Sequence, residues 1–385
     1  MPDWSQLKSF VRQNNSQAHL AICNTDIFDD TVTNGVYGFP HSGTSRMKSY
    51  WRALASMYNI GLNDLIFLYR TNGDVDGCKQ IHGPFKIYER RDIPAIYYDL
   101  ESDDFPLFIG SNTDCKVRFM FENMSDEVIS NSDNFELVKR FETRDIWGYR
   151  HPAVMNIGAA RKKSVTSFTT SQTLVMLDLL EDFGIHRRDL TYNSLPEKDR
   201  INYYDNITVD YYHYHLDDDF ILNNYTDDEA FYYSHIIRAF KLDNCPYRSN
   251  LMEDFWNVNN QMLEKQGITS FADITVNVLL ETVVTVHLQD ELDVVTTNAD
   301  DSALMFFEFK KDYITESSVR QAENYIDLLS VIFPQKKLFA NVVGCGLEND
   351  TITVNPRYSD KIKLVEFDVV NETPLQISFS DARNP

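Results

Sequence analysis

The sequence has few cysteines and none in a spacing that suits a disulfide framework or a metal site. Its 385 residues include five cysteines, which are widely separated and never form a Cys-x-x-Cys pair. An odd number of isolated cysteines argues against disulfide stabilisation and against a thiolate zinc site. A reducing, cytoplasmic environment is therefore the expectation.

Long apolar runs and an excess of basic charge are also lacking. No apolar stretch reaches the ~18 residues that a membrane-spanning helix needs, and residues 1–18 are polar without a signal-type apolar core. Lys plus Arg number 36 against 58 Asp plus Glu, a formal net charge of −22. This balance excludes a basic nucleic-acid coat and a polybasic membrane-surface protein. We expect no association with membranes.

Several common catalytic motifs are absent as well. There is no Gly-rich phosphate loop of the Walker type, so nucleotide-driven translocation is not expected. Ser/His/Asp catalysis has no supporting nucleophile-elbow motif. His213 and His215 alternate in a Tyr-rich stretch, but no third ligand has metal-site spacing, and a surface strand is the favoured interpretation. What remains is a globular chain, 43% hydrophobic and 13% aromatic, with length for two or three domains.

The first third of the chain predicts a small β-barrel. Short apolar segments are separated by turn residues, and one stretch, residues 45–58, has a helical period. Short strands at this spacing, with one helix between the early strands, are typical of small barrels. The expected strands are His19–Cys23, Gly35–Phe39, Asp64–Arg70, Gly77–Tyr88 and Cys115–Phe121.

Residues 18–125 resemble the EVE, PUA and YTH-like group of small barrels. The resemblance rests on GVYGFP at 35–40, YNIGLNDLIFLY at 58–69, IHGPFKI at 81–87 and CKVRF at 115–119. The group's usual Gly-Asp before the apolar strand is Asn63-Asp64 here. These barrels bind nucleic acids and often grip a modified or flipped base. The resemblance therefore implies a nucleic-acid reader over residues 1–135.

A flipped base needs aromatic walls and a few polar groups for its hydrogen-bonding edge. The expected walls are Phe39, Tyr50, Trp51 and Tyr69, and the expected polar partners are Ser42, Ser45 and Asn34. The competing interpretation is that each aromatic belongs to the core, which is favoured for Tyr69 inside its apolar strand. Trp51, which follows a Gly/Ser loop, is the better pocket residue.

A local basic segment follows the predicted barrel, between residues 139 and 163. It holds seven Lys and Arg against two acids, with Trp147, Tyr149 and His151 interleaved. Cations meet phosphates and aromatic rings stack on bases, so this segment is expected to contact nucleic acid. The alternative is an ordinary solvated face. The expected backbone contacts are Arg144, Arg150, Arg161, Lys162 and Lys163.

The most informative pattern lies in residues 249–385, after a stretch (136–248) expected to be a mostly helical connecting region. Asp293 lies in an apolar ELDVV segment, and Glu308 and Lys310 lie two apart in FEFK. Period-two geometry puts Glu308 and Lys310 on one face, and an Asn/Asp-rich turn at 298–302 predicts a hairpin that brings Asp293 near them. The surrounding segments predict the order α–β–β–β–α–β, with helices at 251–266 and 316–332.

Charged groups in apolar strands are costly unless they are paired or bound to metal. Two carboxylates, Asp293 and Glu308, suit Mg²⁺ (or Mn²⁺), and Lys310 could orient the attacking water or stabilise developing phosphorane charge. Gln321 in the next helix could face the same site. The alternative is a structural carboxylate–lysine pair on a half-exposed hairpin.

Residues 250–345 resemble the PD-(D/E)XK nuclease superfamily, the fold of many restriction and repair endonucleases. On this resemblance Asp293, Glu308 and Lys310 match the signature, and Gln321 matches the Gln often found on the following helix. The usual Pro before the Asp is absent. The superfamily often carries a Glu on its first core helix. Glu253 would fill this role, or Glu281 if the core helix is instead 271–283.

The expected fold is an α+β chain with an N-terminal PUA-like β-barrel, a helical middle segment and an α/β PD-(D/E)XK core. The expected function is a Mg²⁺-dependent endonuclease that hydrolyses DNA after the barrel has recognised a modified base, as in modification-dependent restriction. Two alternatives stay open: a non-cleaving modified-base or RNA reader with a degenerate nuclease fold, and a DNA-repair or RNA nuclease. DNA is favoured over RNA, and double-strand cleavage would call for a homodimer.

Overall fold

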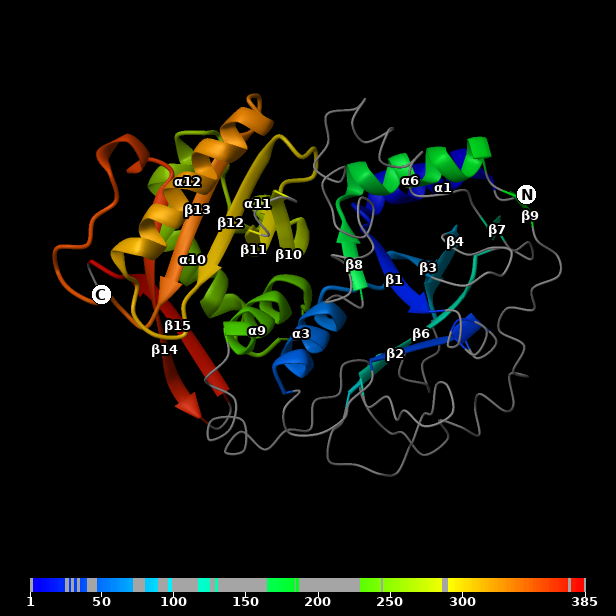
Figure 1. Ribbon diagram of the computed structural model, residues 1–385, viewed down its shortest axis with the longest axis horizontal. Helices are drawn as coiled ribbons and strands as arrows, with labels where there is room; N and C mark the ends of the chain where they lie inside the picture. Colours follow the sequence, from blue (N-terminus) through cyan, green and yellow to red (C-terminus); the bar gives the residue numbers. More distant parts are fainter. Residues whose placement is uncertain are drawn as a thin grey trace. The chain divides into compact units, whose positions relative to one another are not determined.

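The computed structural model divides the chain into two compact units, Met1–Leu216 and Asp217–Pro385. Both units mix helices with a β-sheet (Figure 1). In the part of the chain that is described, no helix is both long and apolar enough to cross a bilayer. The structure describes residues 3–24, 28, 31–32, 35–39, 47–71, 80–88, 96–98, 117–124, 129–130, 165–183, 185–186, 229–243, 245–285, 290–372 and 375–383.

The sheet of the first unit is a curled half-barrel with the strand order β2-β6-β4-β3-β1-β8. β1 and β3 run parallel, with helix α3 between them in the chain, whereas the other neighbours along this order pair antiparallel. Short strands β5, β7 and β9 add to its margins. The five predicted strands are confirmed as β1, β2, β3, β4 and β6, and the predicted helix as α3. The elements are β1 (Ala18–Asn24), β2 (Val36–Phe39), α3 (Met47–Tyr58), β3 (Leu65–Thr71), β4 (Gln80–Ile87), β5 (Ile96–Tyr98), β6 (Val117–Asn123), β7 (Ile129–Ser130), β8 (Val165–Phe168) and β9 (Ile185–His186).

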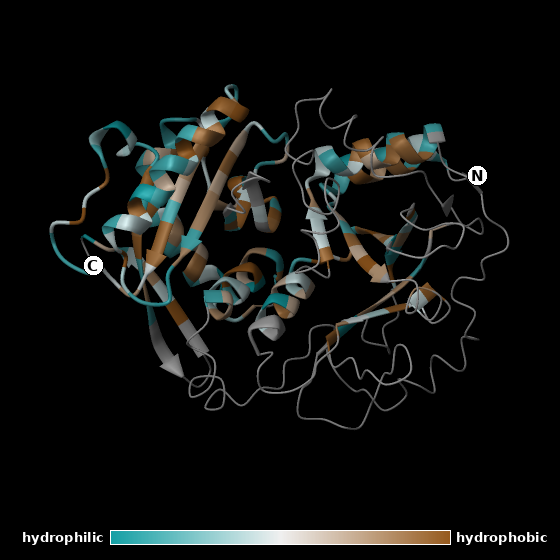
Figure 2. Cartoon of the chain, viewed as in Figure 1, coloured by the Kyte–Doolittle hydropathy of each residue, from teal (hydrophilic) through white to brown (hydrophobic). Residues whose placement is uncertain are grey.

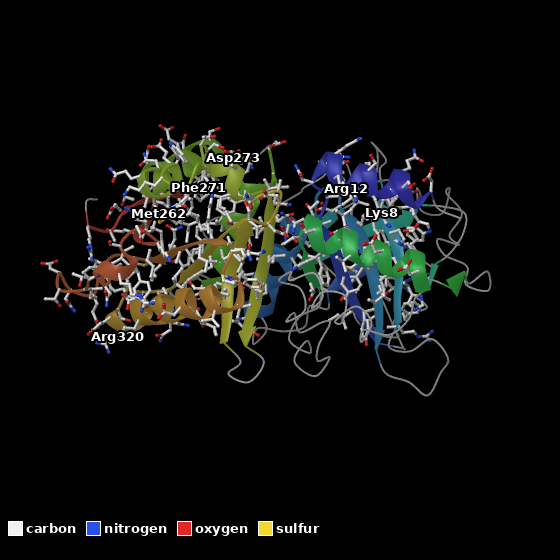
Figure 3. The ribbon with its side chains drawn as sticks, turned by 90° about the horizontal axis from the view of Figure 1, so that it is seen from above. Lys8, Arg12, Met262, Phe271, Asp273 and Arg320 are labelled. Atoms are coloured by element: carbon white, nitrogen blue, oxygen red, sulfur yellow. The ribbon has the colours of Figure 1, made fainter. Side chains whose placement is uncertain are left out.

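Two helices, α1 (Trp4–Asn14) and α6 (Thr170–Phe183), pack with one face of this sheet into a single apolar core. Alternate strand residues such as Leu20 and Phe67 point into it, as period-two geometry requires. Lys8 on α1 (Figure 3) pairs with Asp178 of α6 at 2.6 Å and with Glu181. The sequence did not predict α1, because its buried stripe is only Leu7 and Val11.

The opposite face of β1 carries a buried chain of polar groups. The Asn59 amide donates to Ser167 Oγ (2.9 Å), which lies 3.0 Å from His19 Nδ1. His19 Nε2 lies 2.9 Å from Asp64 Oδ2, and Asp64 also accepts the Gln17 backbone N–H. The order resembles a Ser–His–Asp triad, but His19 is completely buried. We therefore interpret this row of hydrogen-bonded groups as structural, because it connects β8, β1 and the start of β3.

The second unit contains a six-stranded sheet in the order β10-β11-β12-β13-β14-β15. The central pairs β12–β13 and β13–β14 are parallel, and the outer pairs are antiparallel. The predicted order α–β–β–β–α–β is confirmed as α10, β10, β11, β12, α12 and β13, with a short helix α11 added. The elements are α9 (Glu229–Lys241), α10 (Arg248–Glu264), α11 (Phe271–Ile274), β10 (Asn277–Thr285), β11 (Asp290–Thr297), β12 (Ala303–Phe309), α12 (Glu316–Ile332), β13 (Lys337–Gly344), β14 (Ile362–Glu372) and β15 (Leu375–Asp381).

Strand β12 is buried on both faces, between helix layers. Phe307 contacts the rings of Phe240 in α9 and Phe255 in α10, with centroids 5.8 and 5.5 Å apart. Phe306, one residue earlier, meets Tyr325 of α12 at 5.9 Å. All seven residues of β12 are buried, which explains why the strand is apolar except at Glu308, near its end (Figure 2).

The stretch expected to be a connecting region is divided between the units. β8 and α6 complete the sheet and core of the first unit, whereas α9 packs in the second. The fold is thus mixed α+β, with a half-barrel sheet and a second sheet. The domain boundaries at 135 and 248 stay predictions.

Candidate active site

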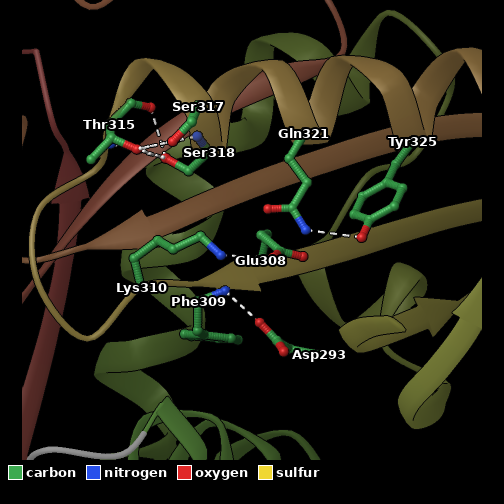
Figure 4. A network of polar contacts seen from close by, with 9 residues as sticks. All are labelled: Asp293, Glu308, Phe309, Lys310, Thr315, Ser317, Ser318, Gln321 and Tyr325. Carbon is green, nitrogen blue, oxygen red and sulfur yellow. Dashed lines mark hydrogen bonds and ion pairs between the residues drawn. The ribbon is translucent and has the colours of Figure 1, made fainter. Parts of the chain in front are cut away.

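The hairpin of β11 and β12 brings two carboxylates and a lysine together at its end. Its antiparallel register places Asp293 beside Glu308, the arrangement expected from the sequence. The Phe309 backbone N–H donates to Asp293 Oδ2 at 2.7 Å, and Lys310 Nζ donates to Glu308 Oε1 at 2.8 Å (Figure 4). Glu308 is 3% exposed, whereas a quarter of the Lys310 side chain (25%) remains accessible. The cluster is therefore buried at Glu308, half-buried at Asp293 and open at its lysine.

The electrostatics of this cluster favour a proton or a cation at Asp293. Burial raises the pKa of the Asp293 carboxyl well above its usual range, and the neighbouring charge of Glu308 raises it further, against the hydrogen bond from Phe309. Burial alone would lower the pKa of Lys310, but the combined attraction of Glu308, Asp293 and Glu229 outweighs it, so that the pKa is raised. Lys310 is thus a stable cation beside an acidic pair.

Glu229, the first residue of α9, adds a third carboxylate that the sequence pattern does not indicate. Its charge raises the pKa of both Asp293 and Lys310, which places it in the electrostatic neighbourhood of the cluster. The only sequence signal is an acid at the start of an apolar helix, and acids are common there because they suit the helix dipole. Nothing in that signal distinguishes a functional glutamate from a capping one.

The helix glutamate chosen from the sequence, Glu253, lies elsewhere in the second unit. It is exposed on α10 and lines a hollow of about 380 Å³ together with Asp254 and Ser378 of β15. β15 is separated from β11 by three strands, roughly 19 Å at the usual strand spacing. The alternative helix at 271–283 is wrong, because residues 277–285 form β10. Glu281 lies in that strand, at the register position across from Asp293.

Gln321 lies on the side of α12 that faces Glu308 and Lys310 (Figure 4). Its amide donates to the Tyr325 hydroxyl at 2.9 Å. This bond fixes the orientation of the amide above the strand end. Gln321 thus lies near the cluster, and its share in a common site stays a prediction.

Asp293 and Glu308 are the pair that could hold a divalent metal. Mg²⁺ is commonly bound by one or two carboxylates, with waters and substrate phosphates completing its shell. Among the described residues, no three His, Cys, Asp or Glu lie close enough to hold one ion together. Glu229 would therefore act by its charge, from outside a two-carboxylate site. Three carboxylates against one ammonium leave an excess of negative charge that a divalent cation would neutralise.

Three of the four aromatic residues expected to form a base pocket, Phe39, Trp51 and Tyr69, are buried in the first unit. Trp51 is 0% exposed and Phe39 is 6% exposed, with the Phe39 ring packed edge-on against Tyr37 at 5.4 Å. Tyr69 belongs to the apolar core, as the competing interpretation held. As placed, these rings favour a core role over a pocket wall. The side chain of Tyr50 and residues Asn34, Ser42 and Ser45 lie outside what the structure describes.

The basic segment also stays a prediction, because it lies outside the described residues. The same holds for His213 and His215. The residues concerned in the basic segment are Arg144, Arg150, Arg161, Lys162 and Lys163.

Comparison with known proteins adds no family to this picture: no family model, no curated protein and no solved structure matches the chain. Function must therefore be inferred from the geometry of the Asp293 cluster.

Proposed function

We propose that the second unit is a metal-dependent nuclease of the PD-(D/E)XK type. The observation that carries the proposal is the cluster itself. Asp293 and Glu308 lie side by side, and Lys310 donates a hydrogen bond to Glu308. It stands at the end of a hairpin in an α–β–β–β–α–β unit, the arrangement that the resemblance implies. A structural ion pair would need only one carboxylate and one lysine. Asp293 adds a second carboxylate, which accepts the Phe309 N–H although its surroundings disfavour its charge, and a neutral amide could accept the same hydrogen bond.

Each residue of the cluster has a role that its geometry suits. Asp293 and Glu308 would hold Mg²⁺, which when bound polarises a phosphodiester and lowers the pKa of a coordinated water. The Phe309 N–H fixes one Asp293 oxygen and leaves the other for the ion. Lys310, charged and partly exposed, would donate to a phosphate oxygen and stabilise charge that develops there. The Gln321 amide would orient the substrate or its water.

The first unit would supply recognition. We assign its half-barrel sheet to the PUA-like group on the strength of the parallel β1–β3 pair, whose strands are connected through α3, and of the motif segments in its strands. A nucleic-acid reader joined to a nuclease would direct cleavage to marked DNA. A modification-dependent restriction endonuclease is the concrete form of the proposal.

A cleavage assay with matched variants tests the proposal. Wild-type protein should cut DNA in Mg²⁺ and not in EDTA, and Lys310→Ala should reduce the rate about 10²-fold or more. Lys361→Ala, which removes a partly exposed lysine before β14, should leave the rate unchanged. Glu229→Gln tests the newly located helix carboxylate and should slow cleavage without unfolding the unit.

Substrate arms separate the remaining alternatives. Duplexes with and without modified cytosine or adenine should differ in rate if the first unit reads a modified base, and an RNA arm tests for an RNA nuclease. Identical behaviour of wild type and Lys310→Ala on every substrate would refute the catalytic role.

A further inference from the structure

The loop between β12 and α12 presents an exposed aromatic ring beside the proposed active site. The Tyr313 side chain is 57% exposed. Among the described residues, the other exposed large hydrophobic residues are Leu62 and Val331. Isolated exposed hydrophobics are common and need no explanation in themselves. The position of Tyr313 is what sets it apart. It lies three residues after Lys310, so the two Cα atoms are at most ~10 Å apart.

The loop that carries Tyr313 is held rigidly on both sides of it. The backbone of Asp312 accepts the Cys345 N–H at 2.8 Å, and the Ile314 N–H donates to Gly346 O at 2.8 Å. Ile314 is completely buried, whereas the side chain of the preceding residue, Tyr313, is exposed. The ring is therefore displayed from a fixed backbone.

Close packing against β13 reinforces this rigidity. A Cβ at Gly344 would lie 2.8 Å from Asp312 O and 2.9 Å from Ile314 Cγ1. Only glycine allows the loop to approach the strand end this closely. The loop thus holds an exposed tyrosine in a fixed position, which suggests that the ring contacts a binding partner.

The local charge does not account for such a partner. Lys311 lies 3.9 Å from Asp312, and the charges of Glu366 and Asp368 also act on Cys345, which bonds the loop, so the surroundings of Tyr313 are acidic and would not attract a phosphate. A contact at this point would therefore be made by the face of the ring and not by charge. Stacking on a nucleobase is the contact that an exposed ring next to a phosphodiester-cleaving site can make, and it requires an unpaired base.

We infer that Tyr313 is a substrate-positioning residue that stacks on an unpaired nucleobase next to the scissile phosphate. The inference rests on the proposed function and narrows its substrate class to nucleic acid with an unpaired base at that point, such as a single strand, a frayed end or a flipped nucleotide. The stacked ring would hold the strand while Lys310 contacts the phosphate.

Binding to a fluorescein-labelled oligothymidylate and to a fully paired duplex, with Ca²⁺ in place of Mg²⁺, tests the inference. Tyr313→Ala should weaken oligothymidylate binding roughly 5- to 150-fold, the range expected for one stacked base. Tyr313→Phe should bind like wild type, because the ring is retained. Val331→Ala removes a more exposed hydrophobic (80%) at the far end of α12 and serves as the control.

The outcomes distinguish this inference from the proposed function. Stacking predicts that Tyr313→Ala has the same dependence of affinity on salt as wild type, since no counterion is released by the ring. If wild type cleaves DNA while Tyr313→Ala binds oligothymidylate as tightly as wild type, the inference is wrong and the nuclease stands. Equal weakening for the single strand and the closed duplex would also overturn it. If wild-type protein neither binds nor cleaves any probe, both fail.

Discussion

Asp293 in the second unit is a residue that lowers the free energy of unfolding of the metal-free protein. Asp293 keeps a carboxyl group in a place where burial and the Glu308 charge both oppose its ionisation. Its one compensating hydrogen bond, from the Phe309 N–H, could be accepted equally well by an amide. Such a residue lowers the stability of the fold when no cation is bound. Active-site groups commonly destabilise a fold in this way.

Asp293→Asn should therefore stabilise the metal-free protein by about 1 kcal/mol while abolishing cleavage. Because the folded pKa lies above the usual 3.8, the folded state binds a proton that the unfolded state has released, and the contribution of Asp293 falls as the pH rises. Denaturant unfolding in EDTA should show a larger advantage for Asp293→Asn at about pH 8 than at about pH 5. Mg²⁺ should stabilise wild type and not the variant. An asparagine variant less stable than wild type in EDTA would contradict this account.

His235 in α9 predicts the opposite dependence on pH. Burial, aided by the charge of Arg238, lowers the pKa of His235 to about 3 from 6.5, and its Nδ1 lies 2.9 Å from the Tyr247 hydroxyl. The unfolded state binds the proton more readily, so stability is full above ~pH 6.5 and falls as the pH drops toward 3, by up to about 1.4 kcal/mol per unit.

Unfolding of the wild type and His235→Gln at about pH 7 and about pH 4.5 measures this dependence. The variant should lose less stability on acidification than wild type. Tyr247→Phe removes the hydrogen bond but not the titrating ring, and should destabilise by a similar amount at both pH values. An equal acid loss in wild type and His235→Gln would show that His235 does not titrate as its burial requires.

At the scale of elements, the sequence predicted the parts of the site that are local and left out those that are not. The β11–β12 hairpin and α12 follow from alternation, a turn and a helical period, so Asp293 and Glu308 could be placed together. Glu229 could not be found, because its proximity depends on how α9 packs against the sheet. β8 was missed for a similar reason: four residues that pair with β1 carry too short a pattern to be recognised alone.

The contact between the 310–315 loop and the end of β13 gives a prediction at this scale. Gly344→Ala would place a methyl group 2.8 Å from Asp312 O, which is backbone and cannot turn away. We expect a loss of about 2 kcal/mol in unfolding free energy, together with slower cleavage as the loop after Lys310 shifts. Gly267→Ala is the control for steric contact, since nothing lies within 4 Å of the Cβ that alanine would add there. Its φ of +78° adds backbone strain but no clash. If Gly344→Ala destabilises the protein but cleaves at the wild-type rate, the position of the loop does not affect cleavage.

At the scale of the whole molecule, the acidic balance bears on how a nucleic acid could be held. A net charge of −22 repels phosphates in general, so the proposed nucleic-acid binding would have to depend on local basic groups and on specific contacts. The carboxylate cluster accounts for few of these charges. The remainder would suppress nonspecific association and make recognition a condition for cleavage.

The salt dependence of binding tests this view. Each phosphate contact contributes about 0.9 to the slope of log affinity against log salt on duplex DNA, so replacing Arg161, Lys162 and Lys163 by Ala should make the slope shallower by up to about 3. Removing the same charge from Arg320, Lys361 and Lys363 of the second unit should change the slope little, because Arg320 is paired with Glu316 and the other two are only partly exposed. Equal changes in both triple variants would mean that overall charge, and not the 139–163 segment, governs binding. A slope unaffected by the first variant would remove that segment from the nucleic-acid interface.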